Sequence, residues 1–139
     1  MGMLPKLAIA TAVATFGLAQ PAVAQDGEDL SSRQVSLYSE MWALAGVCNQ
    51  LVGYDVRQDD LADFLNDSLA SAVDEDQIAI AQTRDERLAA IRAEVERLES
   101  LPRGSRRQRE VDENAENLMS RCTRLANDDT AGEFFVRIS

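Results

Sequence analysis

Two cysteines, Cys48 and Cys122, constrain the fold of this chain more than any other feature of its sequence. Each lies in a run of apolar residues spaced 4, 3, 4 and 3 positions apart, which is the spacing of one face of an α-helix. The runs are Leu37, Met41, Leu44, Cys48, Leu51 and Val111, Ala115, Leu118, Cys122, Leu125. Both cysteines should therefore face the core of a helical domain, where a disulfide can join them.

Residues 1–24 have the organisation of a secretory signal peptide. Lys6 gives a basic start, an apolar run follows from Leu7 to Ala19, and Ala22-Val23-Ala24 has the small residues of a cleavage site. About 13 apolar residues are too few to span a bilayer, which needs about 20. We therefore predict cleavage after Ala24 and a periplasmic or secreted location; the alternative is an uncleaved amphiphilic helix. An oxidising compartment favours the disulfide.

The remaining chain is long enough for one domain with a modest core. We expect residues 25–30 to be flexible and residues 31–139 to form a single helical domain that ends in an apolar tail. In the chain-entropy model, closing a loop of about 75 residues with a disulfide stabilises the fold by up to roughly 4.5 kcal/mol. The Cys48–Cys122 bond would then be a large share of the total stability.

Four helices are predicted from capping residues that precede the periodic segments. They start at Ser31, at Asp59 or Asp60, at Asp74 and at Ser105. Capping-box spacing is given by Gln34, Gln77 and Gln108, and the ends are marked by Gly53, Ala72, Pro102 and Gly104. The pattern predicts an all-α bundle of three long helices and one short crossing helix, with one disulfide.

The cysteines also predict the chain path, because each lies near the C-terminal end of its helix. In a simple up-down-up-down bundle their heights would differ by roughly 16 Å, at 1.5 Å per residue. A disulfide needs Cα atoms within about 7 Å. We therefore expect the short helix to cross the bundle, so that the third helix runs antiparallel and the fourth parallel to the first. A large stagger between the first and last helices is the alternative.

The composition excludes several chemistries. Histidine is absent and there are only two cysteines, so Ser-His and Cys-His nucleophiles, His-containing zinc sites and iron–sulfur clusters lack their residues. We predict no catalytic residue, no metal and no cofactor; a carboxylate-based enzyme is the remaining catalytic alternative. The net charge of −10 becomes −11 when Lys6 is removed, which argues against nucleic acid and favours a basic protein partner.

Three groups of residues are candidate partner contacts, and each has a structural alternative. The first is the arginine cluster Arg103, Arg106, Arg107 and Arg109. Its structural alternative is a solvated tip of a helical hairpin. The second is Asp60, Asp63 and Asp67 on one side of the second helix. Its structural alternative is an ordinary solvated helix face. The third is Trp42 and Tyr54, which gather with Tyr38 on or just after the first helix; the structural alternative is that Trp42 and Tyr38 border the core. The tail Phe134–Ile138 either adds a strand to a partner or packs back over the bundle.

The tripeptides Val47-Cys48-Asn49 and Arg121-Cys122-Thr123, with the short apolar tail, resemble small exported two-cysteine helical proteins of proteobacteria that are catalogued as domains of unknown function. The plan is also similar to acid-stress periplasmic chaperones and to periplasmic immunity proteins that block wall-degrading toxins. These resemblances imply a non-enzymatic periplasmic binding or accessory protein. The alternative is a structural envelope protein that self-associates, for example as a homodimer.

Overall fold

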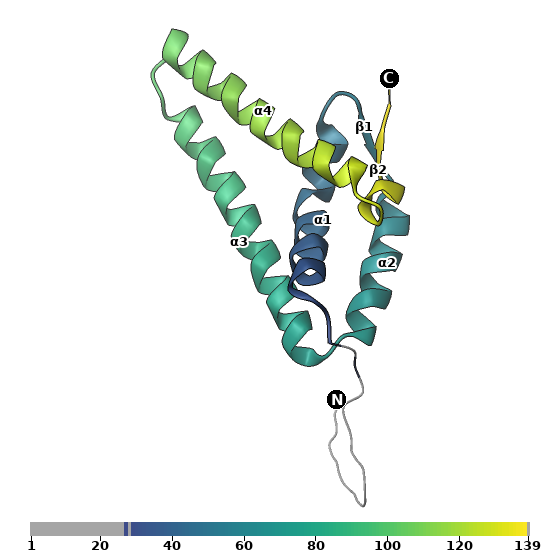
Figure 1. Cartoon of the computed structure of the whole chain (residues 1–139). Coiled ribbons are helices and arrows are strands. Elements are labelled where there is room, and N and C mark those ends of the chain that lie inside the picture. The colour runs from purple at the N-terminus through teal and green to yellow at the C-terminus, as the bar shows by residue number, and fades with distance from the viewer. Residues whose placement is uncertain (1–26, 28, 139) are drawn as a thin grey trace, which may run out of the picture.

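The computed structural model of the protein describes Gly27 and residues 29–138. The predicted signal peptide, residues 1–24, lies outside the described residues, as do residues 25, 26 and 28 of the predicted flexible segment 25–30. The helices are α1 (Ser32–Gln50), α2 (Gln58–Ser71), α3 (Asp74–Glu99) and α4 (Ser105–Asn127), and the strands are β1 (Tyr54–Val56) and β2 (Phe135–Arg137), with the 3₁₀ turn η1 (Ala131–Glu133) before β2. An all-α bundle with three long helices and a shorter one is confirmed (Figure 1).

The start of α1 is the capping box that the sequence predicts. Ser31 Oγ accepts the N–H of Gln34 at 3.1 Å, and the side-chain oxygen of Gln34 accepts the N–H of Ser31 at 2.9 Å. The end of α1 comes earlier than predicted, and Gly53, at φ +94°, lies in the turn toward β1. Because α2 also begins early, Asp59 and Asp60 lie in its first turn, where the helix dipole favours carboxylates.

The helices α3 and α4 begin at their predicted residues, but their predicted capping boxes are wrong. The N-cap positions are Val73 and Gly104, whose side chains offer no acceptor. Gln77 instead donates to the carbonyl of Ala72 at 3.0 Å, and Gln108 bonds to a side chain of its own helix. Apolar packing of Val73, which is only 6% exposed, takes the place of a polar cap on α3.

The central helix of the fold is α1. Its residues Met41, Leu44 and Cys48 are fully buried, and α2, α3, α4 and β1 all contact it. The small buried residue Ser39 brings α3 close, because its hydroxyl lies 3.3 Å from the carbonyl of Ile80 on α3. The core therefore forms around α1, and the other elements are positioned by it.

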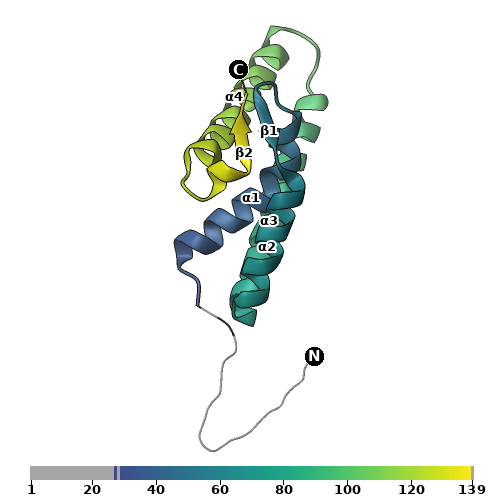
Figure 2. The same ribbon diagram turned by 90° about the vertical axis from the view of Figure 1, so that its right-hand side faces the viewer.

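The chain path differs from the prediction, because α1 and α3 run in the same direction (Figures 1 and 2). Contacts advance together along both helices. The N–H of Leu30 donates to Asp76 at 2.8 Å near their starts, and the guanidinium of Arg84 lies 3.9 Å from the ring centre of Trp42 further along. The last helix, α4, returns against this direction and crosses α1 at an angle instead of running parallel to it.

The cysteines meet because α3 is much longer than α1. The two helices have 26 and 19 residues, which gives lengths of about 39 and 28 Å at 1.5 Å per residue. They start at similar levels, so α3 carries the turn at residues 100–104 beyond the end of α1. From there the inclined α4 brings Cys122 to the level of Cys48. The predicted path assumed helices with aligned ends; the stagger given as the alternative is closer to the structure.

The C-terminal tail Phe134–Ile138 packs back on the protein. Its strand β2 pairs antiparallel with β1, with Tyr54 opposite Arg137 and Val56 opposite Phe135. Phe135 is fully buried. The strand β1 was not predicted, because an alternation over three residues is too short to be recognised in a sequence.

Reducing the disulfide, or replacing both cysteines by Ala, should lower the free energy of unfolding by about 2–4 kcal/mol, because the open chain regains conformational entropy. Denaturant titration with and without reductant measures the difference. The double alanine variant is the control: it should be insensitive to reductant. A wild-type protein with the same stability in both conditions would contradict the proposed contribution of the bond.

Candidate functional site

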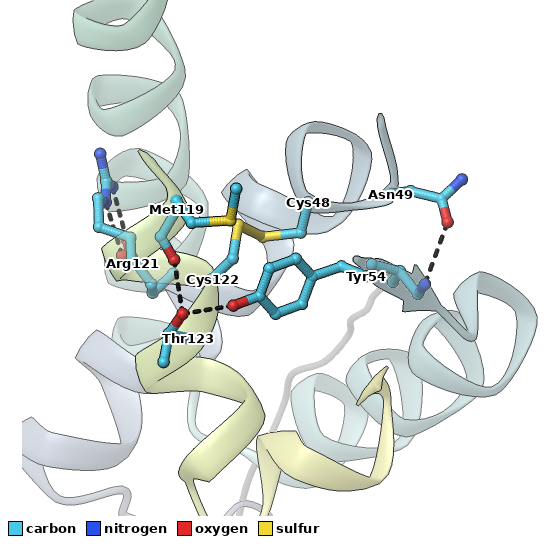
Figure 3. The surroundings of a disulfide bond; sticks show 9 residues. Cys48, Asn49, Tyr54, Met119, Arg121, Cys122 and Thr123 are labelled. Atoms are coloured by element: carbon cyan, nitrogen blue, oxygen red, sulfur yellow. Dashed lines mark hydrogen bonds and ion pairs between the residues drawn. A yellow bond between two sulfur atoms is a disulfide. The ribbon is translucent and has the colours of Figure 1, made fainter. Parts of the chain in front are cut away.

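The disulfide between Cys48 and Cys122 lies where α4 crosses α1 (Figure 3). The pairing is the one that the sequence predicts, and the two Cα atoms are 5.8 Å apart. Both cysteines are fully buried. Among the residues that the structure describes in α4, only Cys122 and Leu125 are buried. The attachment of this helix to the core is therefore concentrated near the bond.

The residues beside the cysteines fix β1 against this junction (Figure 3). Asn49 accepts the N–H of Val56 at 3.0 Å. The hydroxyl of Tyr54 is hydrogen-bonded to that of Thr123, which itself donates to the carbonyl of Met119 at 2.9 Å. Because a threonine hydroxyl has one hydrogen, Tyr54 is the donor to Thr123. The short strand thus links the ends of α1 and α4 by polar contacts as well as by the disulfide.

The carboxylate of Glu40 joins three helices. Arg121 of α4 donates to it from Nε and Nη2, both at 2.8 Å, and Arg87 of α3 donates at 3.1 Å. The side chain of Glu40 is 17% exposed. Burial opposes its charge, but the hydrogen bond from Arg121 and the positive charges of Arg121, Arg87 and Arg124 outweigh burial and lower the pKa of Glu40. The same contact raises the pKa of Arg121.

A cleft of about 720 Å³ opens beside Glu40, between α1, α3 and the end of α4. We call it the arginine cleft, because its charged lining is Arg33, Glu40, Arg87, Arg121, Arg124 and Asp128. These residues are spread over 96 positions of the sequence, so no local motif predicts the cleft. The one signal is that Glu40 is the only acidic residue between Asp29 and Asp55.

The outer part of the α3–α4 hairpin projects from the core. We call residues 88–119 the arm; Figures 1 and 2 show its two helices diverging below the turn that joins them. Its apolar residues are only partly covered: Val95 is 39% exposed, and Val111 and Met119 are each 37% exposed. Near the tip, by contrast, Leu98 is buried. The arm therefore carries an apolar seam that α3 and α4 do not close by themselves.

Ion pairs hold the tip of the arm together. Arg97 of α3 lies 2.9 Å from Glu110 of α4 and 2.7 Å from Glu94, and Arg106 lies 2.9 Å from Glu110. Hydrogen bonds from Arg97 lower the pKa of Glu94, and those from Arg106 and Arg97 lower the pKa of Glu110. Arg97 and Arg106 are 46% and 73% exposed, although the side chain of Glu110 is only 17% exposed. Solvent therefore screens these pairs, and they set the geometry of the tip more than its stability.

The predicted charged contacts lie in two separate places. The arginine cluster is at the arm tip, where Arg103, Arg106 and Arg109 are exposed and Arg107 is half-buried. The predicted acidic face is on α2, where Asp60, Asp63 and Asp67 are all exposed. Figure 1 places the tip and α2 well apart, so the two groups cannot form one contact patch.

The predicted aromatic contacts are parts of the packed structure. Tyr54 is 7% exposed and belongs to the core cluster. Trp42 is half-buried, and the guanidinium of Arg84 covers its ring in a cation–π contact. The position of Arg84 on the otherwise apolar face of α3 is explained by this contact.

No family model matches the sequence, and neither a curated protein nor a solved structure shows significant similarity to it. Within Gly27 and residues 29–138, no helix has the length and apolar character needed to cross a membrane. In the same residues, no cluster of acidic or cysteine side chains has the arrangement of a metal site. The candidate sites are thus the arm and the arginine cleft, and only the residues of these two sites indicate what they could bind.

Replacing Glu40 by Gln should weaken the pH dependence of stability. Because the folded pKa of Glu40 is lowered, its contribution is complete above the unfolded value, about 4.3, and is lost as the pH falls through the folded pKa. Glu40→Gln should lower the free energy of unfolding by roughly 1–3 kcal/mol near neutral pH, because two arginines lose a charged acceptor. The difference from wild type should shrink as the pH falls through the folded pKa of Glu40. Denaturant titration between neutral and acidic pH measures it.

The matched control is Glu94→Gln, which removes a carboxylate that also pairs with arginine but is solvent-exposed. We expect little change at any pH in this variant, because exposed pairs contribute little. Identical pH profiles for wild type and Glu40→Gln would show that Glu40 does not link the helices energetically.

Proposed function

We propose that the protein is an exported, non-enzymatic binding protein that contacts its partner through the arm. The observation that carries the proposal is the apolar seam at Val95, Val111 and Met119, each more than a third exposed, on an arm that leaves a disulfide-bonded core. Several partly exposed apolar side chains on one element, bordered by charges, are typical of protein interfaces. A pair of helices that presents such a seam is suited to pack against helices or a groove of another protein.

The magnitude of the apolar contribution is modest at each position. A Val or Met side chain gains about 1.5–3 kcal/mol on full burial, so covering the remaining third of one would add roughly 0.5–1 kcal/mol. Several seam residues must then be covered together by one partner. The ion pairs at the tip support this use, because they hold the two helices in a fixed relation before binding.

Charge favours a basic partner. Residues 55–76 contain eight acidic side chains (Asp55, Asp59, Asp60, Asp63, Asp67, Asp74, Glu75 and Asp76) and a single arginine, Arg57. This acidic stretch would attract a basic protein and accelerate its encounter. An inhibitor or immunity role against a basic enzyme in the periplasm is the version of the proposal that this charge distribution supports.

An acid-responsive chaperone is the second version, and the Glu40 cluster favours it. Protonation of Glu40 would remove the shared acceptor of Arg87 on α3 and Arg121 on α4. The arm could then separate further and expose more of its seam. Binding of an apolar dye that rises on acidification in wild type, and already at neutral pH in Glu40→Gln, would support this version over the inhibitor.

Site-specific photo-crosslinking in the native host tests the arm. A crosslinking side chain at position 111 or 119 of the full chain should yield the same adduct, whereas positions 78 and 52 should not. Ile78 (56% exposed) and Val52 (90% exposed) are apolar, exposed and outside the arm. The substitution Val111→Asp should abolish the adduct formed from position 119, and Ile78→Asp should leave it unchanged.

The result also separates the alternatives. An adduct at twice the mass of the chain would support the self-associating structural protein in place of a separate partner. Adducts that form from positions 52 or 78 but not from the arm would place the contact elsewhere and overturn the proposal. Circular dichroism and the intact disulfide verify that each variant is folded.

A further inference from the structure

The arginine cleft is large enough to be a binding site, and it is separate from the arm. Its volume of about 720 Å³ lies within the roughly 300–1,000 Å³ typical of pockets for small ligands. Three helices contribute to it: α1 provides Arg33, α3 provides Arg87, and α4 provides Arg121 and Arg124. None of these residues belongs to the arm tip or to the acidic stretch, and only Arg87 adjoins the base of the arm.

The cleft is positively charged in an acidic protein. Its described charged residues are four arginines and two carboxylates, Glu40 and Asp128, which leaves an excess of two positive charges. The whole chain, by contrast, has a net charge of −10. A local excess of this kind attracts anions to one place on a surface that otherwise repels them.

The arginines differ in how far they are already engaged. Arg121 holds Glu40 with two donors, and Arg87 divides its bonds between Glu40 and Ser36. Arg33 makes one contact, 3.2 Å from Asp128, with 79% of its side chain exposed. Among the described residues, Arg124 is bonded only to Ser120, at 3.4 Å. Arg33 and Arg124 therefore keep guanidinium donors for a ligand.

The chemistry of the lining indicates which anion it would take. Guanidinium groups bind carboxylates in a planar, two-donor geometry, and Arg121 already holds Glu40 in this way inside the same cleft. Leu37, which is half-buried, adds an apolar surface beside the arginines, and Leu125 also lines the cleft but is only 3% exposed. We infer that the cleft binds an organic carboxylate that carries an apolar group, with the carboxylate at Arg33 and Arg124 and the apolar group against Leu37.

Such a carboxylate has two sources, a free acid or the C-terminus of a peptide, and calorimetric titration of the mature chain distinguishes them. The probes are hexanoate, acetate, inorganic phosphate, and a short peptide ending in Leu with either a free or an amidated C-terminus. We expect hexanoate or the free-acid peptide to bind at least about tenfold more tightly than acetate, phosphate and the amide. Tighter binding of the peptide acid than of hexanoate would assign the site to a polypeptide terminus, and the reverse to a free acid.

The variants Arg124→Gln and Arg33→Gln should each reduce the affinity roughly tenfold or more, since each removes a charged hydrogen-bond donor. Arg124→Lys should recover only part of it, because Lys keeps the charge but not the fork. The matched control, Arg109→Gln at the exposed arm tip, should leave binding unchanged. Both cleft arginines are exposed, so the variants should fold, and their melting temperatures verify this.

Several outcomes would overturn the inference. They are equal affinity for phosphate and hexanoate, equal loss in Arg109→Gln and Arg124→Gln, or no binding of any probe at concentrations up to about 10 mM. Because the arm contributes none of Arg33, Arg124, Leu37 and Leu125, a failure here leaves the proposed arm contact untouched. Failure of the arm crosslinks leaves carboxylate binding untouched in the same way.

Discussion

The covalent bond between Cys48 and Cys122 attaches α4 to the rest of the protein at the point where this helix meets the core. In the described part of α4 only Cys122 and Leu125 are buried. Apolar packing therefore anchors only a short part of this helix. The bond and the contacts beside it, from Tyr54 to Thr123 and from Arg121 to Glu40, fix the angle at which α4 leaves. The position of the arm and the shape of the arginine cleft both follow from that angle.

Charge is distributed unevenly over this framework. The acidic stretch lies on β1, α2 and the start of α3, the arginine cleft lies on the side where α4 meets α1, and the arm tip combines arginines with glutamates. Opposite charges that are paired at the tip and at Glu40 connect helices, whereas the unpaired acidic surface of α2 connects nothing within the described residues. In the proposed function these surfaces would have different tasks: attraction of a basic protein at α2 and apolar contact at the arm, while the contacts of Glu40 link the helices internally.

Local features were predicted well from the sequence where one interaction decides the outcome. The capping box of Ser31 and Gln34 was predictable because it depends on side-chain spacing within one segment, and the disulfide because each cysteine lies on the apolar face of its own helix. The helices α3 and α4 begin at the predicted residues, although the capping boxes that predicted them did not form. The predicted boxes at Gln77 and Gln108 did not form, because the N-cap positions are the buried Val73 and the exposed Gly104 instead of Asp74 and Ser105. The aromatic residue Tyr54 was a predicted contact, but pairing with the distant tail buried it.

The sequence by itself determined that the protein is helical, that its two cysteines face inward, and that histidine-dependent chemistry is excluded. Periodicity and composition carry this information, because they are properties of single segments or of the whole chain. Only the tertiary structure decided that α1 and α3 run in the same direction, that α4 crosses α1, and that Arg33, Arg87, Arg121 and Arg124 line one cleft. Those outcomes depend on relative helix lengths and on contacts between residues far apart in the chain, which no local pattern records.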